Sequence, residues 1–226
     1  MKRLRHIIFD CDGVLVDSEI VAAQVSNRYM NNLGLNFTLE DHFKNFSGMK
    51  YSEIFEQLIK DGLLSNDLDY WTLITEIEQE VMHTMKPIEG VSDGLNEIKD
   101  LPKAIVSNSQ LFHIKHSLEM AGIEMHFGDK LFSAEMVEKP KPNPMVYLHA
   151  AESLKVEPTD CLVIEDSTSG VKAAVEAGMH VIAFLGAGHI LPGHEQKVLD
   201  IGAKKTFDDM SRLREMVYAY EDAFDF

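Results

Sequence analysis

Short apolar runs that end in polar residues or glycine recur along the chain, and each has the composition of a strand buried on both faces. The runs are His6 to Phe9, Ala104 to Val106, Cys161 to Ile164 and Val181 to Phe184. Between them lie segments with apolar residues at helical spacing, namely Leu111 to Ala121, Met145 to Leu154 and Val171 to Ala177. Because strand and helix alternate, the pattern predicts an α/β fold with a doubly wound, Rossmann-like parallel sheet.

The segment from Asp17 to Lys86 interrupts this alternation, because its apolar residues follow helical spacing throughout. It begins directly after the first predicted strand, whereas a crossover between parallel strands needs only about a dozen residues. A helical insertion of this length predicts a separate subdomain that acts as a lid. We therefore expect a core domain of residues 1–16 and 87–226 and an α-helical cap subdomain of residues 17–86.

Composition and charge narrow the classes of function. The chain has 226 residues and is 45% hydrophobic, which is enough for a large core with an insertion. Its 21 Lys and Arg against 37 Asp and Glu give a net charge of −16, which disfavours nucleic acid as a partner. No apolar run approaches the ~20 residues that cross a bilayer. With Cys11 and Cys161 in or beside apolar runs, we expect a cytoplasmic protein with reduced thiols and no membrane partner.

The strongest chemical signal is the stretch HIIFDCDGVLVDSE, from His6 to Glu19. Its apolar strand leads directly into Asp10 and Asp12, and Gly13 then permits a sharp turn. Residues two apart in an extended chain point to the same side, so both carboxylates emerge at the carboxyl end of a strand. Open α/β sheets place their ligands there. The alternative is a turn whose acidic side chains only face water.

A second buried strand ends in an acid pair within CLVIEDSTSGVKAA, from Cys161 to Ala174. Glu165 and Asp166 form this pair, although Asp166 taken alone fits a residue that caps the next helix. If both strands are central, four carboxylates share one crevice, which is costly unless a cation is present. Hard oxygen ligands with room for water favour Mg²⁺.

Two further segments complete a predicted phosphate site. The stretch AIVSNS ends a third buried strand in Ser107, Asn108 and Ser109, which can donate hydrogen bonds to phosphoryl oxygens or cap the next helix. Lys139 lies in EKPKPNP, where prolines restrict the backbone. A lysine in such a turn is commonly solvated, but here it would offset the acid cluster.

The four motifs, in this order and over essentially the whole chain, resemble those of haloacid dehalogenase-like (HAD) hydrolases with a helical cap. Within that superfamily the chain is similar to the phosphatases and β-phosphoglucomutases. The resemblance implies a phosphoric monoester hydrolase in which Asp10 is the nucleophile, forms an aspartyl-phosphate, and is assisted by Asp12 as general acid and base. We expect a small phosphorylated metabolite as substrate, a sugar phosphate or a phosphorylated sugar acid, and a monomer or weak dimer.

The same resemblance assigns the binding residues. It implies that the phosphoryl group is held by Ser107 and Lys139, the latter of which also takes part in catalysis, and Asn108 is expected as a further donor to the phosphoryl oxygens. It implies that Mg²⁺ is bound by the carboxylates of Asp10 and Asp166 and the backbone carbonyl of Asp12, with Glu165 acting through water or another side chain. In similar proteins a cap loop reads the substrate, which makes Lys50 in FSGMKYSE a candidate, with an exposed lysine at a helix start as the alternative.

Three alternative functions remain. Mutases carry a histidine where Ala22 stands here and an arginine where Tyr51 stands, which favours a phosphatase. A phospho-receiver domain needs no helical insertion, and a dehalogenase or phosphonatase would be expected to lack the acid at Asp12. The GAGH stretch from Gly186 to His189 lacks a dinucleotide-binding fingerprint, so we expect a flexible loop there.

Overall fold

The computed structural model describes residues 6–46 and 49–223, which form two compact units. The core unit runs to Asp17 and resumes at Lys86, and the cap unit comprises Ser18–Met85. Each junction lies one residue from the boundary expected from the sequence. None of the helices in the described ranges is long and apolar enough to cross a membrane.

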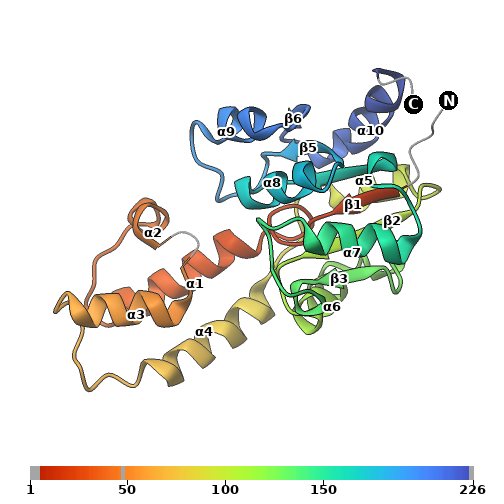
Figure 1. Cartoon of the computed structure of the whole chain (residues 1–226). Coiled ribbons are helices and arrows are strands. Elements are labelled where there is room, and N and C mark those ends of the chain that lie inside the picture. The colour runs from red at the N-terminus through yellow and green to blue at the C-terminus, as the bar shows by residue number, and fades with distance from the viewer. Residues whose placement is uncertain (1–5, 47–48, 224–226) are drawn as a thin grey trace. The chain divides into compact units, whose positions relative to one another are not determined.

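The core unit is built on a six-stranded sheet in the order β3-β2-β1-β4-β5-β6, and every neighbouring pair is parallel (Figure 1). The strands are β1 (His6–Phe9), β2 (Lys103–Ser107), β3 (Leu131–Ser133), β4 (Cys161–Glu165), β5 (His180–Phe184) and β6 (Lys205–Phe207). Because β1 lies between β2 and β4, the carboxyl ends of these strands meet at one edge of the sheet.

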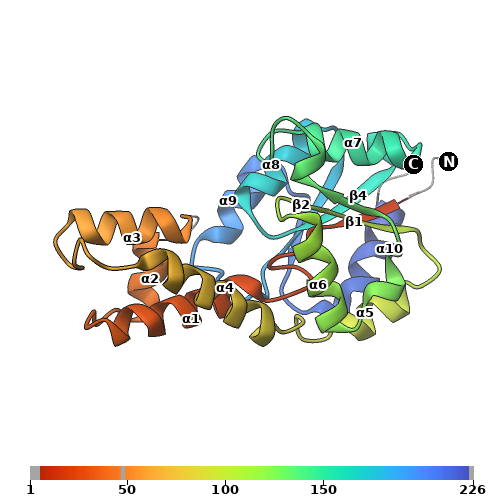
Figure 2. The same cartoon turned by 90° about the horizontal axis from the view of Figure 1, so that it is seen from below.

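Helices cover both faces of this sheet, as Figure 2 shows for α7 and α8 on one side and α5 and α10 on the other. The core helices are α5 (Val91–Glu97), α6 (Leu111–Ala121), α7 (Met145–Leu154), α8 (Thr168–Glu176), α9 (His194–Ile201) and α10 (Leu213–Ala223). Side chains from α7, α8 and α9 share a buried apolar cluster with Ile8 and Val163 of the sheet. The predicted doubly wound α/β fold is confirmed.

Burial of the central strands on both faces explains their apolar runs. Ile7, Ile8 and Phe9 of β1 are each 0% exposed, and all of β4 is buried. The first polar side chains after these strands therefore emerge at the sheet edge. Cys11 and Cys161 are buried free thiols.

The described part of the cap unit consists of helices α1 (Ser18–Asn32), α2 (Leu39–Phe46), α3 (Tyr51–Lys60) and α4 (Tyr70–Thr84). Val21 and Val25 of α1 pack with Ile74 and Ile77 of α4, so residues at helical spacing form the apolar centre of this unit. A second cluster joins Met30, Leu35, Phe46, Ile54 and Leu58.

The chain leaves and re-enters the core unit at adjacent points. The Asp17 amide donates to the Lys86 carbonyl over 2.9 Å, and the Ile88 amide donates to the Leu15 carbonyl over 3.0 Å. Val16 also forms an antiparallel bridge with Pro87. The two connections to the cap are thus held side by side by backbone hydrogen bonds.

Candidate active site

Asp10 is the first residue after β1. Its amide donates to the Ile164 carbonyl over 2.9 Å, which extends the β1–β4 ladder by one residue and fixes the backbone at the sheet edge. The residue is only 7% exposed. Burial raises the pKa of Asp10 well above its usual value, the Lys141 ammonium opposes this shift, and nearby carboxylates reinforce it.

Lys141 supplies the cation of the site. Its Nζ lies 2.7 Å from Asp10 Oδ1 and 2.8 Å from Glu165 Oε1, and it donates to the Val106 carbonyl over 2.8 Å. Burial acts to lower the pKa of Lys141, but the two carboxylates outweigh it and raise that pKa well above its usual value. The ammonium is therefore charged, and its donors point at the nucleophile expected from the sequence.

This geometry corrects the lysine assignment. Lys139, which the resemblance implied as the phosphate-binding and catalytic lysine, is exposed in the turn two residues earlier. The stretch EKPKPNP contains two lysines that each precede a proline, and Lys141 is the one whose backbone the site holds. Asn108 makes this selection, because its Oδ1 accepts from the Lys141 amide over 2.9 Å and its Nδ2 donates to the Lys141 carbonyl over 3.1 Å.

These contacts differ from the predicted role of Asn108, which was to donate to phosphoryl oxygens, because its side chain binds the Lys141 backbone. Both ends of its amide are engaged with the backbone of Lys141, so the side chain fixes the lysine loop instead of being aimed only at phosphate. Ser107 is 1% exposed at the end of β2, and its Oγ accepts from the Ser109 amide over 2.9 Å.

Asp12 is held by hydroxyl groups. Its Oδ2 accepts from Ser109 Oγ over 2.7 Å and from Ser107 Oγ over 3.4 Å, so β2 orients this carboxylate from the neighbouring strand end. Ser109 is fixed in turn, because Ser133 Oγ donates to its carbonyl over 2.7 Å. Asp10 and Asp12 thus have different environments, an ammonium for the first and neutral hydroxyls for the second.

Glu165 is saturated with donors. Its Oε1 accepts from Lys141 and, over 3.2 Å, from the Tyr147 hydroxyl. Its Oε2 accepts from the amides of Asp166 and Ser167, each over 2.9 Å, and from Ser167 Oγ over 3.0 Å. Burial acts to raise the pKa of Glu165, but Lys141 and the other donors outweigh it and lower that pKa. Glu165 is therefore a charged partner that positions Lys141.

The acid cluster fits a divalent cation. Carboxylate oxygens of Asp10, Glu165 and Asp166 lie within 4.8 Å of one another, and all three residues are buried. Both Glu165 oxygens are already occupied, which leaves Asp10 and Asp166 as the carboxylates with capacity for a metal. A hard, all-oxygen donor set that carries excess negative charge suits Mg²⁺.

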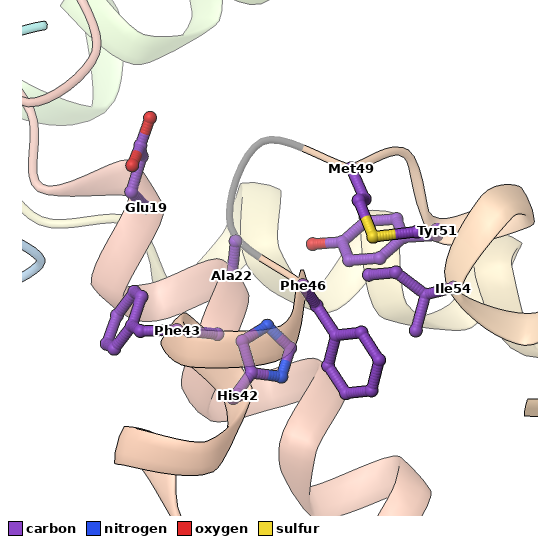
Figure 3. A pocket seen from close by; sticks show the side chains of 9 residues that line it. Glu19, Ala22, His42, Phe43, Phe46, Met49, Tyr51 and Ile54 are labelled. Carbon is purple, nitrogen blue, oxygen red and sulfur yellow. The ribbon is translucent and has the colours of Figure 1, made fainter. Parts of the chain in front are cut away.

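The cap unit contains a pocket of its own, with a volume of ≈ 260 Å³ (Figure 3). It is lined by Glu19, Ala22, Ala23, His42, Phe43, Phe46, Met49, Tyr51 and Ile54. Apolar side chains predominate, and no lysine or arginine is among these described lining residues. Lys50 is exposed, although it lies in sequence between two residues of the lining.

Three further participants around Glu165 and Asp166 were not anticipated from the sequence. Tyr147 projects from α7 toward Glu165, and Gly170 leaves room for that carboxylate. His189 lies beside Asp166, with Nε2 3.1 Å from Oδ2. A tyrosine or a glycine in a helix carries no specific signal of such a role, and the histidine stands in a segment with no periodic pattern.

An acid pair, a buried lysine and hydroxyl donors at the carboxyl ends of adjacent parallel strands define a site suited to phosphoryl transfer. The sequence profile of the haloacid dehalogenase-like hydrolases matches residues 7–184. The chain belongs to this family, and the fold and enzyme class expected from the sequence are confirmed.

Individual relatives agree with this assignment. A 6-phosphogluconate phosphatase of Escherichia coli is 30% identical over 218 residues, which cover 96% of each chain. A haloacid dehalogenase-like protein of unknown function from Agrobacterium tumefaciens has 34% identity and a TM-score of 0.82, covering 96% of this chain and 99% of that one. A HAD family hydrolase from Deinococcus radiodurans, solved with bound phosphate and sodium, has 27% identity and a TM-score of 0.86, covering 99% and 97%.

Proposed function

We propose that the protein is a Mg²⁺-dependent phosphatase that hydrolyses a small phosphorylated metabolite through an aspartyl-phosphate intermediate. The observation that carries this proposal is the placement of Asp10 against Lys141, with Asp12 and Asp166 at adjoining positions of the same sheet edge. The relative named as a 6-phosphogluconate phosphatase and the phosphate in the Deinococcus hydrolase support the same reaction class.

The first half-reaction transfers the phosphoryl group to Asp10. A carboxylate oxygen of Asp10 attacks phosphorus in line, the bond to the leaving oxygen breaks, and Asp12 donates a proton to that oxygen. The second half-reaction uses Asp12 as a base that takes a proton from the attacking water, which releases phosphate and regenerates Asp10. Ser109 and Ser107 support this cycle, because their hydroxyls keep the Asp12 carboxylate in one orientation.

Charge stabilisation is the other requirement. The Lys141 ammonium, held by Glu165, supplies positive charge beside the transferred phosphoryl group. The Ser107 hydroxyl turns from its long 3.4 Å contact with Asp12 to donate to a phosphoryl oxygen, while Ser109 continues to hold Asp12. The carboxylates of Asp10 and Asp166, together with the Asp12 carbonyl, would hold Mg²⁺. When bound, the ion neutralises the phosphoryl oxygens and favours the ionised form of Asp10, against the burial that raises the pKa of that residue.

The substrate class that we propose is a sugar phosphate or a phosphorylated sugar acid. The cap pocket combines apolar carbons with the Tyr51 hydroxyl, the His42 imidazole and the Glu19 carboxylate, which suits a chain of alternating C–H and hydroxyl groups. Lys50 is the proposed contact for a second anionic group of the substrate.

A β-phosphoglucomutase is the nearest alternative, and the cap pocket argues against it. Ala22 and Tyr51 both line that pocket, where the Tyr51 hydroxyl points toward Ala22 (Figure 3). Ala22 has no group that can move a proton, and Tyr51 cannot bind a second phosphate in the bidentate manner of an arginine. Water is therefore the expected acceptor of the phosphoryl group.

A phosphate-release screen over phosphorylated metabolites, with Mg²⁺ and with excess chelator, tests the proposal. We expect Mg²⁺-dependent release that is strongest on sugar phosphates or phosphorylated sugar acids and absent in Asp10→Asn. Full activity in chelator would remove the metal from the mechanism. Phosphorus NMR with β-glucose 1-phosphate as substrate distinguishes a phosphatase from a mutase. Formation of glucose 6-phosphate without comparable inorganic phosphate would identify a mutase.

A further inference from the structure

The loop after β5 brings a histidine onto the proposed metal site. His189 Nε2 lies 3.1 Å from Asp166 Oδ2, and the two side chains are 12% and 3% exposed. The contact is therefore almost completely shielded from water. An imidazole nitrogen at this distance is within hydrogen-bonding range of the carboxylate oxygen.

The pair packs directly on the turn that follows Asp12. Gly13 has a φ of +77°, and a Cβ placed on it would lie 1.9 Å from Asp166 Oδ2 and 2.9 Å from His189 Cε1. The absence of a side chain at Gly13 thus leaves the space in which Asp166 and His189 meet. The sequence predicts Gly13 only as a turn residue. In the structure its lack of a side chain also makes room for Asp166 and His189.

Separate contacts fix the loop and the backbone of Asp166. The Gly188 amide lies 3.3 Å from each carboxylate oxygen of Asp17, which ties the loop to the end of the core segment. His194, at the start of α9, has Nε2 2.6 Å from the Asp166 carbonyl. Imidazoles therefore contact both the main chain and the side chain of Asp166.

We propose that His189 is a positioning residue for the metal site, donating from Nε2 to Asp166 Oδ2 and so fixing the carboxylate that would hold the divalent cation. This inference rests on the metal centre of the proposed function. A carboxylate that binds a metal through one oxygen is oriented by a hydrogen bond to the other, and loss of such a partner weakens metal affinity by about 10- to 100-fold. The GAGH stretch from Gly186 to His189 therefore contributes a residue to the proposed metal site.

The test measures metal binding without turnover. Chelator-treated protein is titrated with Mn²⁺, and free Mn²⁺ is followed by electron paramagnetic resonance, for the wild type, His189→Ala, His189→Gln and Asp166→Asn. His113→Ala, which removes an imidazole from α6, is the matched control. We expect the dissociation constant to rise about 10- to 100-fold in His189→Ala. Recovery is expected in His189→Gln, which retains an N–H donor, and no change is expected in His113→Ala.

Activity supplies a second readout. In His189→Ala the Mg²⁺ concentration for half-maximal activity should rise, while kcat at saturating Mg²⁺ stays close to that of the wild type. Equal Mn²⁺ affinity in wild type and His189→Ala would overturn the inference and leave the proposed function standing. A wild type that binds Mn²⁺ no better than Asp166→Asn would remove the metal centre itself. A metal-free melting temperature that falls in parallel with affinity in both His189 variants would assign a purely structural role.

Discussion

Gly170 and Glu165 are in contact across the first turn of α8: a Cβ on Gly170 would lie 1.6 Å from Glu165 Oε1 and 2.4 Å from Oε2. Glu165 is the carboxylate that holds Lys141 and accepts from Tyr147. The helix could therefore not carry a side chain at position 170 without displacing the anion that orients the lysine of the site.

Gly170→Ala should consequently destabilise the protein, although alanine in a helix is ordinarily favoured over glycine by up to about 1 kcal/mol. The displaced Glu165 would leave Lys141 without one of its two charge partners. Chemical denaturation and phosphate release measure the two effects, and both should fall. Ser169→Ala, one residue earlier in the same turn, is the control. Unchanged or increased stability in Gly170→Ala would mean that Glu165 has another position available.

The two lysines of EKPKPNP provide a matched pair of variants. Lys141→Met should abolish activity and lower the free energy of unfolding by about 3 to 5 kcal/mol, because Asp10 and Glu165 would remain buried without their cation. Lys139→Met should leave both quantities close to the wild type, since Lys139 is exposed. Steady-state kinetics and urea unfolding would decide, and the opposite pattern would restore Lys139 to the site.

The choice between these lysines shows where sequence reasoning stops. Strand β1 and the acids that follow it were predictable, because burial on both faces demands an apolar run and the sheet edge exposes what comes next. Nothing in EKPKPNP distinguishes Lys139 from Lys141. The distinction arises from the two hydrogen bonds of Asn108, a residue far away in the sequence.

The two outermost strands of the sheet, β3 and β6, were not predicted from the sequence for a related reason. β3 (Leu131–Ser133) and β6 (Lys205–Phe207) have only three residues each, too few for a periodic pattern. Each instead pairs with a longer strand, β3 with β2 and β6 with β5. The helices α6 and α7 have the predicted bounds, because their apolar spacing extends over several turns and a glycine or prolines mark an end.

Asp10→Asn should lower kcat by about 10³-fold or more, because it removes the proposed nucleophile while preserving shape. Ser109→Ala should have a milder effect, since Asp12 would lose its 2.7 Å hydroxyl donor but keep Ser107. Rapid-quench measurements with an activated ester would separate formation from hydrolysis of the aspartyl-phosphate. Wild-type turnover by Asp10→Asn, with reversion by deamidation excluded by mass spectrometry, would contradict the assignment.

His42 makes stability depend on pH. Burial lowers the pKa of His42 below its usual 6.5, so below that pH the unfolded chain binds a proton that the folded chain does not. The contribution of His42 is complete above the unfolded pKa and is lost as pH falls from there through the folded pKa. The loss of unfolding free energy between about pH 7.5 and about pH 5.5 should therefore be smaller in His42→Leu than in the wild type. Urea titrations at both pH values test this, and equal losses would contradict it.

Lys50 offers a test of whether the cap recognises the substrate. It is exposed between Met49 and Tyr51, and no lysine or arginine is among the described residues that line the cap pocket. An ammonium there would act on a second anionic group rather than on the phosphoryl group. The pair 6-phosphogluconate and glucose 6-phosphate isolates this effect, because the first carries a carboxylate that the second lacks.

Lys50→Ala should raise KM for 6-phosphogluconate by about 10-fold, the loss of one charge-assisted hydrogen bond, and change KM for glucose 6-phosphate much less. Hydrolysis of p-nitrophenyl phosphate, which has no second anionic group, should be almost unaffected. Lys60→Ala, at the exposed end of α3, is the control for the loss of a cap charge. Equal losses on all three substrates would show that Lys50 supports the cap or the general site, whereas unchanged kinetics on all of them would remove Lys50 from substrate binding.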